Sequence, residues 1–277
     1  MSINNFIPNV WSQTLLKELD REYIAVKNSN REFEGDIKKS GDRVHVHAIG
    51  NIDVFNYTKN TDMSQPQVLD GTRRTINIDQ VRAFNFQLDD VDKAQAVPTI
   101  MQSAMRQAAN SLANAADSHI FGLHGQVSAA NTITATLNAN NVVDIMLSAR
   151  ERLLANDVNS NNDTVLEVSP AVGALILRAK ILTSTENTGA IDNGYIGDFL
   201  GFKVYVSNNI ARVGAVHQCF ARTTRAIAFA EQVHEIEAYR PERRFADAVK
   251  GLHLYGAGIV YPNELIRLSL TPTGTAT

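Results

Sequence analysis

The stretch FADAVKGLHLYGAGIVYPNEL, residues 245–265, decides the fold. Its alternation predicts a β-strand in which the two leucines point to one face. Gly256 and Gly258 continue that face without a side chain, so another part of the chain must approach the backbone closely there. Pro262 cannot donate a hydrogen bond to a neighbouring strand, so the strand must end before it.

Composition excludes several classes of protein. The 277 residues carry a net charge of −3, whereas a dedicated nucleic-acid binder needs a basic stripe. Weak contact with nucleic acid on one face stays open. The single cysteine, Cys219, lies in an apolar run and is expected to be a buried thiol rather than a nucleophile. No apolar run approaches the ~18 residues that span a bilayer, and the N-terminus lacks the pattern of a signal peptide. We therefore expect a protein of a reducing cytoplasm with no membrane partner.

The first half of the chain predicts a helix, a long hairpin and a second helix. Residues 11–27 have helical periodicity, and this helix can pack on its own domain or reach a neighbouring molecule. Alternation at 42–57 and again from Thr75 to Val81 predicts two strands joined by a polar loop at 58–74. Such a hairpin is marginal in water by itself and needs a surface to lie on. The alanine-rich stretch 94–116 predicts a helix, which at about 25 residues is ~38 Å long.

Shorter elements alternate in the second half of the chain. Residues 226–230 are apolar throughout, as in a buried central strand. The other expected elements are a helix at 141–153 capped by Asn141, a strand at 164–168, a helix started by Ser169 and Pro170, a polar loop at 183–193 and a strand at 201–207.

Two clusters of potential metal ligands have simpler explanations. Asp89, Asp90 and Asp92 could hold a hard cation such as Mg²⁺, but acidic residues at the start of a long helix also cap its free amides. We favour the cap. His45 and His47 share one strand face without a third ligand nearby, so solvated or interface histidines are favoured.

One cluster is densely basic, and motifs of catalysis are absent. Residues 240–244, RPERR, suit salt bridges between subunits and also phosphate contacts, and the first is favoured. The sequence holds no phosphate-binding loop, no Gly-x-Ser-x-Gly elbow, no His-Glu-x-x-His and no Cys-x-x-Cys. We therefore assign no catalytic residue, no metal ligand and no cofactor.

Five motifs in order resemble those of tailed-bacteriophage major capsid proteins, which have the Hong Kong 97-type capsid fold. The succession of N-terminal helix, hairpin, long helix, mixed region and closing strand resembles that fold too. The motifs are FIPNVW at 6–11, NREFEG at 30–35 with residues 37–44, FNFQLDD at 84–90, GYIG at 194–197 with GFKVYVSN at 201–208, and the closing stretch 245–265.

This resemblance implies an α+β chain with four parts. They are an N-terminal arm at 1–34, an extended β-hairpin (the E-loop) at 35–88, a peripheral domain with a long spine helix at 89–137 and 221–277, and an axial domain at 138–220. The arm and the hairpin use a neighbouring subunit as their missing core. The residues expected at subunit interfaces are Trp11, Tyr23, Asp53, Tyr57, Asp62, Pro66, Arg73, Arg240, Arg243 and Arg244.

The implied function is that of a structural subunit, not an enzyme. Hexamers and pentamers of the chain form the icosahedral shell of the virion capsid around double-stranded DNA, which is contacted non-specifically. Assembly takes place in the host bacterial cytoplasm with a portal. Some members begin with a scaffolding extension, whereas here the arm starts almost at once, so we expect a separate scaffolding protein.

Two alternatives stay open. One is a cellular encapsulin-like compartment shell of the same fold that stores a cargo enzyme. The other is a metal-dependent enzyme that uses the cluster of Asp89, Asp90 and Asp92.

Overall fold

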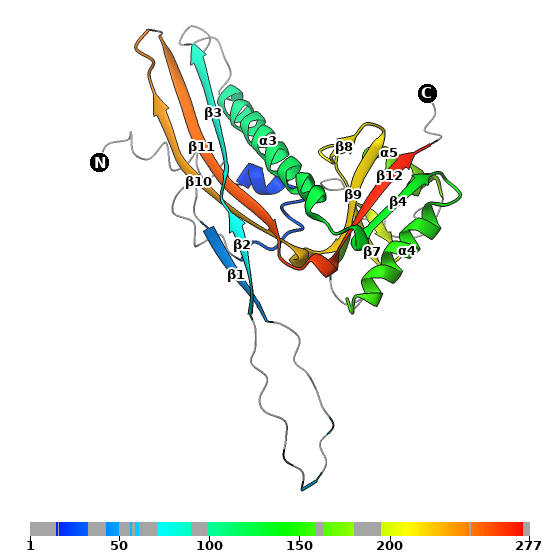
Figure 1. Ribbon diagram of the computed structural model, residues 1–277. Coiled ribbons are helices and arrows are strands. Elements are labelled where there is room, and N and C mark those ends of the chain that lie inside the picture. Colours follow the sequence, from blue (N-terminus) through cyan, green and yellow to red (C-terminus); the bar gives the residue numbers. More distant parts are fainter. Residues whose placement is uncertain are drawn as a thin grey trace.

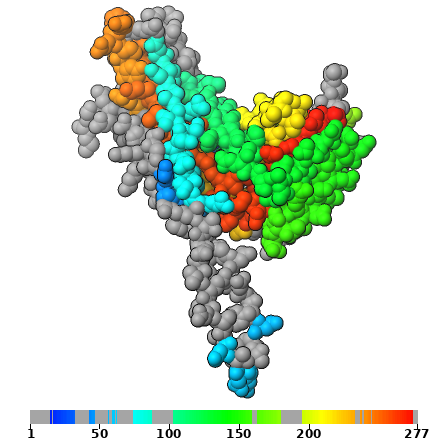
Figure 2. Space-filling model, in the orientation of Figure 1, coloured from blue at the N-terminus to red at the C-terminus, as the bar shows by residue number. Residues whose placement is uncertain are grey.

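The computed structural model shows an elongated sheet with a long helix along it, a second sheet flanked by two helices, and a hairpin that projects away from both (Figure 1). The space-filling view shows the same three parts (Figure 2). The structure describes residues 15, 17–32, 43–49, 56, 59–60, 62, 71–89, 99–158, 163–179, 195–243 and 245–273.

The elongated sheet has three antiparallel strands in the order β10 (Ile227–Tyr239), β11 (Ala246–Ile259) and β3 (Gln80–Asp89). The closing stretch of the sequence thus forms the central strand β11. It ends at Ile259, and Pro262 opens a short 3₁₀ turn, η7 (Pro262–Glu264), as its missing N–H predicts.

The apolar run at 226–230 is buried as expected, but it begins the edge strand β10 rather than a central one. Its free edge is covered by Asn30. The Asn30 N–H donates to the carbonyl of Ile227 at 2.9 Å, and the Phe229 N–H donates to the Asn30 carbonyl at 2.9 Å. The short parallel bridge satisfies the edge and explains how a wholly apolar run can stand at the side of a sheet.

The alanine-rich helix is confirmed as α3 (Thr99–Gly122), which continues six residues beyond the predicted end. It packs along the three-stranded sheet (Figure 1). The first turn described holds no acidic residue. The cap expected from Asp89, Asp90 and Asp92 stays a prediction, because residues 90–98 lie outside the described part of the chain. Asp89 is the last residue of β3, and the other two lie outside the described residues. The buried side chains of the helix are Met105, Ala109, Leu112, Ala113, Ala116, Asp117, Ile120 and Phe121.

The hairpin is confirmed as β1 (Arg43–Ile49) paired antiparallel with β2 (Gly71–Asn77). The second strand begins four residues before the predicted Thr75. After Asn77 the chain passes through Ile78 and Asp79 and continues as β3 into the large sheet. The hairpin is therefore an extension of the sheet that turns away from it (Figure 1).

The second sheet has seven strands and carries the alternating elements expected from the sequence. Its path runs β4-β12-β9-β5-β7-β6, and β8 pairs with β9. The strands are β4 (Thr132–Leu137), β5 (Thr164–Val168), β6 (Tyr195–Phe199), β7 (Phe202–Val206), β8 (Arg212–Val213), β9 (Val216–Thr223) and β12 (Leu265–Pro272). The helices are α4 (Val142–Ala155) and α5 (Pro170–Arg178), with short 3₁₀ turns at η3 (Leu123–Gln126), η4 (Ala129–Asn131) and η6 (Thr224–Ala226). The predicted loop at 183–193 lies outside the described residues.

The two predicted helix caps differ in outcome. Ser169 caps α5, because its hydroxyl accepts from the Val172 N–H while Pro170 takes the first helical position. Asn141 stands at the start of α4 without capping it. Its side chain instead accepts from the Asn138 N–H at 2.8 Å and donates to the Thr136 carbonyl at 2.8 Å, which closes the turn between β4 and α4.

The strands next to the expected domain boundaries at 137/138 and 220/221 belong to the seven-stranded sheet, and the boundaries themselves stay a prediction. β12 pairs with β9 and with β4, so the last strand and β4 both belong to the seven-stranded sheet. β9 itself runs across residue 221. β12, the last strand, belongs to this sheet because the turn η7, which begins at Pro262, redirects the backbone away from β11.

The N-terminal helix ends earlier than predicted. Residues 17–22 are helical, a turn occupies 25–28, and residues 11–14 lie outside the described part of the chain. The Tyr23 N–H still bonds to the Leu19 carbonyl at 3.1 Å. The next three N–H groups are taken by the carboxylate of Asp117, which ends the helix by competing for its donors.

Candidate interaction surfaces

The first surface is the base of the hairpin, where the predicted close approach to β11 is found. A Cβ atom built on Gly256 would lie 2.2 Å from the carbonyl oxygen of Asn77, and one on Gly258 would lie 3.2 Å from Ile76 Cγ1. The two glycines thus admit β2 against the leucine face of β11. An apolar cluster closes the contact with Val44, Val46, Ile76, Ile78, Ala228, Ala230, Leu254 and Val260.

The strands β1 and β2 lead from this base away from the two sheets (Figure 1). His45 is exposed on β1, and its Nδ1 lies 3.2 Å from Thr75 Oγ1 on the paired strand. An isolated two-stranded hairpin is marginal in water, so packing at the base stabilises these two strands.

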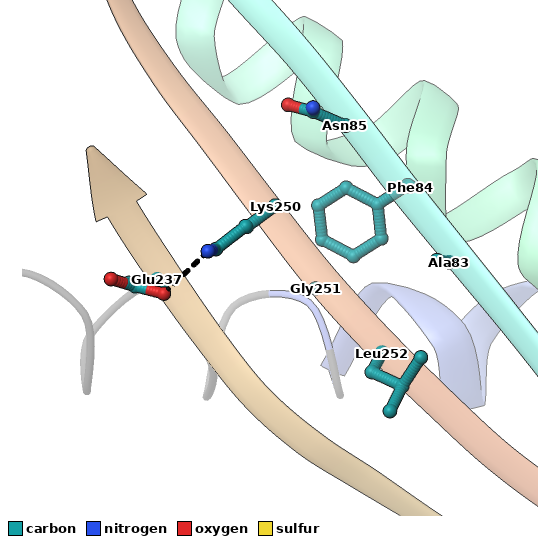
Figure 3. Close-up of a pocket in the computed structure, with 7 residues that line it drawn as sticks. All are labelled: Ala83, Phe84, Asn85, Glu237, Lys250, Gly251 and Leu252. Atoms are coloured by element: carbon teal, nitrogen blue, oxygen red, sulfur yellow. Dashed lines mark ion pairs between the residues drawn. The ribbon is translucent and has the colours of Figure 1, made fainter. Parts of the chain in front are cut away.

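The second surface is a shallow pocket of about 350 Å³ on the three-stranded sheet. Glu237 on β10 and Lys250 on β11 form an ion pair at 2.8 Å across one side of it (Figure 3). The Lys250 ammonium also lies 5.1 Å from the ring centre of Tyr239. The floor is apolar and is made by Ala83, Gly251 and Leu252. This combination of an apolar floor with a charged rim is typical of a protein contact.

The third surface is a groove of about 450 Å³ between β3 and α3. Phe84 and Phe86 stack along it with ring centres 6.1 Å apart. Gly251 makes room for the first ring, because a Cβ there would lie 2.5 Å from Phe84 Cε1. The side chains that α3 contributes are mostly small: Ala104, Gln107, Ala108, Ser111, Leu112 and Ala115.

The fourth surface is the tip between β10 and β11, which holds the predicted basic cluster. Arg240 Nε lies 3.3 Å from the Asp247 carboxylate, and both side chains keep much of their exposure. Arg243 is exposed, and Arg244 lies outside the described residues. Phe245 is 85% exposed, the most exposed large apolar side chain of the described part of the chain. Phe245 was not among the residues expected at interfaces, although a phenylalanine directly after a polar turn is the signal that marks it.

The remaining expected interface residues are distributed unevenly. Tyr23 is fully buried inside its own chain, where its hydroxyl donates to the Glu231 carboxylate. Asp62 is exposed near the end of the hairpin. Arg73 lies on β2 opposite His47. Trp11, Asp53, Tyr57 and Pro66 lie outside the described residues.

The described residues show no constellation for metal binding or nucleophilic catalysis. Within them, no three potential ligand side chains gather into a metal site. Cys219 is fully buried, as expected, and burial raises the pKa of its thiol to about 12. His217 lies close to Ser169 at 2.5 Å, but this hydroxyl is fully buried and serves as the cap of α5. Among the described helices, none has both the length and the apolar character to cross a membrane.

The comparisons with known proteins agree with this geometry. A family model described as phage capsid protein matches residues 73–268, more than two thirds of the chain. The chain belongs to the phage capsid protein family. It is a structural subunit of a capsid shell, and its place is in the virion capsid. The family implies a structural rather than an enzymatic role and assembly with further copies of the same chain.

Solved structures share the fold. A chain from Mycobacterium phage Che8 is 24% identical, with a TM-score of 0.67 over 89% of this chain and 90% of that one. The capsid of Ralstonia phage GP4 is 10% identical, with a TM-score of 0.68 over 93% and 91%. A virus-like particle from Pyrococcus furiosus is 14% identical, with a TM-score of 0.61 over 93% and 96%. No curated protein sequence matches significantly. The expected α+β capsid fold is thus confirmed.

Proposed function

We propose that this capsid subunit assembles into hexamers and pentamers that close an icosahedral shell around double-stranded DNA. The proposal rests on one observation: a single subunit has both projecting elements and open surfaces. The projecting elements of one subunit can therefore bind the open surfaces of the next. The hairpin and the tip after β10 project, while the groove beside α3 and the pocket on the sheet are open. Contacts between unlike surfaces are heterologous, and they generate rings when the rotation closes.

The parts of the subunit take the roles that the resemblance implies. We assign residues 1–34 to the N-terminal arm and 35–88 to the E-loop, with α3 as the spine helix of the peripheral domain. The axial domain is centred on the seven-stranded sheet. Of the expected interface residues, those of the hairpin (Asp53, Tyr57, Asp62, Pro66 and Arg73) and those of the tip (Arg240, Arg243 and Arg244) stay proposed subunit contacts, and so does Trp11. Tyr23 is not proposed again, because it is fully buried inside its own chain.

The proposed partners besides the chain itself are a separate scaffolding protein, a portal and the packaged DNA. Contact with DNA is non-specific, because a chain with a net charge of −3 cannot supply a strongly basic wall. Assembly takes place in the host bacterial cytoplasm. The subunit has no catalytic role, and neither a metal nor a cofactor is assigned to it.

The test is electron microscopy of the purified chain, alone and co-expressed with scaffold genes from the same genome. Closed shells, or hexameric and pentameric rings, are the expected result. The double variant Arg240→Glu and Arg243→Glu reverses two charges at the tip and should lower the yield of shells at least tenfold. Arg212→Glu, an exposed arginine on β8, is the matched control and should leave the yield unchanged. Persistent monomers or dimers of the unaltered chain under both conditions would contradict the proposal.

A second candidate is a cellular compartment shell of the encapsulin type. The similarity to the Pyrococcus furiosus virus-like particle favours keeping it. The contents of the shells distinguish the two: packaging of DNA in the presence of a portal supports the phage capsid, and selective loading of a protein cargo supports the compartment.

A further inference from the structure

Residues 23–31, which we call the strap, cross the junction between α3 and both sheets. Three charged side chains hold the strap, and each comes from a different element. They are Asp117 of α3, Arg222 of β9 and Glu231 of β10, and all three are at most 8% exposed. The strap also buries Tyr23, Ala25 and Val26 in the core. Segments of this size open and close as cooperative local units of the native structure.

Asp117 binds the backbone of the strap. Its Oδ1 accepts from the N–H groups of Ala25 at 3.0 Å and Val26 at 3.1 Å, and its Oδ2 accepts from Ile24 at 3.1 Å. The residue is 1% exposed. No cation pairs with this carboxylate in the part of the chain that the structure describes.

Arg222 binds the carbonyl groups of the same turn. It donates to Asn28 at 2.6 Å and to Ala25 at 3.1 Å. Its own charge is matched by a two-point ion pair with Glu167 of β5, at 2.9 and 2.8 Å. Both side chains of this pair are fully buried.

Glu231 holds the two ends of the strap. It accepts from the Tyr23 hydroxyl and, at 2.8 Å, from Arg31, while His253 Nε2 lies 2.8 Å from the same carboxylate. The other nitrogen of this histidine, Nδ1, is buried without a hydrogen-bond partner. Arg31 also reaches Asp20, whose side chain is 59% exposed and keeps its water.

The three buried carboxylates under the closed strap differ in their partners. Glu167 pairs with Arg222, and Glu231 pairs with Arg31 and also faces His253. Asp117 faces three backbone amides and, among the described residues, no cation. A buried carboxylate without a counter-ion is costly, and protonation removes the cost.

We propose that residues 23–31 form a proton-linked strap: when it closes over α3, Asp117 takes up one proton from water at Oδ2, so the strap is held more tightly in acid than in alkali. Because the strap touches α3, β9 and β10, its closure fixes the two sheets of the subunit against each other. Opening of the strap frees them to change their relative orientation.

Two opposing effects act on this carboxyl group: burial without a cation favours the protonated form, and the three amide donors favour the ionised form. Oδ2 accepts only the bond from Ile24, so it is the oxygen that can take the proton at the loss of one bond. Burial, together with the charge of the nearby Glu167, raises the pKa of Asp117 to about 7 against the lowering effect of the three backbone hydrogen bonds. The other charged and titratable groups that face this region are Tyr23, Arg31, His119, Arg222, Glu231 and His253.

The direction of the pH effect follows from linkage. With the strap open, the hydrated carboxyl has its ordinary pKa, whereas closure raises that pKa, so the closed state binds more protons. Closure therefore weakens as the pH rises from the ordinary carboxyl range to about 7. Below the ordinary range both states are protonated, and above the raised pKa both are ionised, so the dependence disappears at each end.

The test is hydrogen exchange of the full chain, followed by mass spectrometry from about pH 5 to about pH 8.5 and corrected for intrinsic rates. Protection of residues 24–29 should fall by up to about tenfold per pH unit between about pH 5 and about pH 7, then level off. Residues 265–270 of β12 serve as the internal reference, and their protection should not follow this profile.

Three variants test whether the proton binds at Asp117. Asp117→Asn keeps an acceptor for Ala25 and Val26 but cannot titrate, so its strap should lose the pH dependence. Asp144→Asn, which alters an exposed carboxylate in the first turn of α4, is the matched control and should keep the unaltered slope. His253→Gln should keep it too, and this variant carries the test if Asp117→Asn folds poorly.

Three results would overturn the proposal. They are protection that does not change with pH in the unaltered chain, an unchanged slope in Asp117→Asn, and loss of the slope in His253→Gln. None of them bears on whether the chain forms shells, because exchange is measured on the folded subunit.

Discussion

Gly256 of β11 lies directly beneath the backbone carbonyl of Asn77, so close that a Cβ atom would come within 2.2 Å of that oxygen. This contact seats the end of β2 on the central strand of the three-stranded sheet. The neighbouring Ile78 and Asp79 then carry the chain into β3. The contact between Gly256 and the Asn77 carbonyl therefore sets the direction in which the hairpin leaves the subunit.

Gly256→Ala should displace the base of the hairpin. The obstacle is backbone rather than a flexible side chain, so we expect the free energy of unfolding to fall by about 1–3 kcal/mol, as in other overpacked sites. Urea unfolding measures the loss, and hydrogen exchange of 43–49 and 71–77 locates it.

Gly125→Ala is the matched control, because nothing lies within 4 Å of a Cβ atom at that position. It should change the free energy of unfolding by less than about 0.5 kcal/mol. Equal stability of the two variants would show that the contact between Gly256 and Asn77 relaxes without cost.

The main elements of the fold could be predicted from the sequence because their signals are local. Alternation identified β11, its two glycines predicted that another part of the chain lies close to it, and alanine content identified α3. The identity of that neighbour, Asn77, could not be predicted, since it depends on a chain reversal far away in sequence. The sheet to which β12 belongs could not be predicted for the same reason, because only its pairing with β4 and β9 reveals it.

The polar contacts of the N-terminal segment could also not be predicted from the sequence. A helical pattern at 11–27 predicted continuation past Glu22, whereas a carboxylate some ninety residues away ends the helix there. Tyr23 was expected at a subunit interface, yet it is fully buried and its hydroxyl bonds to Glu231 inside the chain. Periodicity predicts which face of a helix is apolar. It does not predict which distant carboxylate competes for the backbone N–H groups of that helix.

The buried ion pair of Arg222 and Glu167 predicts a large loss on truncation. Arg222→Ala leaves Glu167 fully buried without its cation and frees two carbonyl groups of the strap. We expect the free energy of unfolding to fall by about 3–5 kcal/mol in urea titrations.

Lys203→Ala removes an ion pair with Asp163 that is exposed on both sides, at 48% and 66%, and serves as the comparison. Its cost should stay below about 1 kcal/mol because water screens such pairs. Similar losses in the two variants would mean that Glu167 regains water when Arg222 is removed.

Cys219 should be inert in the folded chain. Burial raises the pKa of its thiol to about 12, so at about pH 8 the reactive thiolate is about one part in ten thousand and is also inaccessible. A thiol reagent such as dithiobisnitrobenzoate should label the protein only after denaturation. Raising the pH toward 9 should increase the thiolate fraction but not the labelling of the native protein, since access is the stricter limit. Rapid labelling of the native protein would contradict the burial of β9.

Phe245 at the tip should matter for assembly and not for folding. Its side chain is 85% exposed in the single chain, so Phe245→Ser should change the free energy of unfolding by less than about 0.5 kcal/mol. In a shell the same ring would be covered by a neighbouring subunit, and its loss would remove apolar area from every copy of that contact. Because many copies of a contact act together, a small loss in each should reduce the yield of closed shells strongly. Light scattering of the unaltered chain and of the variant, at matched concentration and folded fraction, measures the effect. Equal shell yields with equal stability would show that the tip stays in solvent after assembly and that the subunit contacts lie elsewhere.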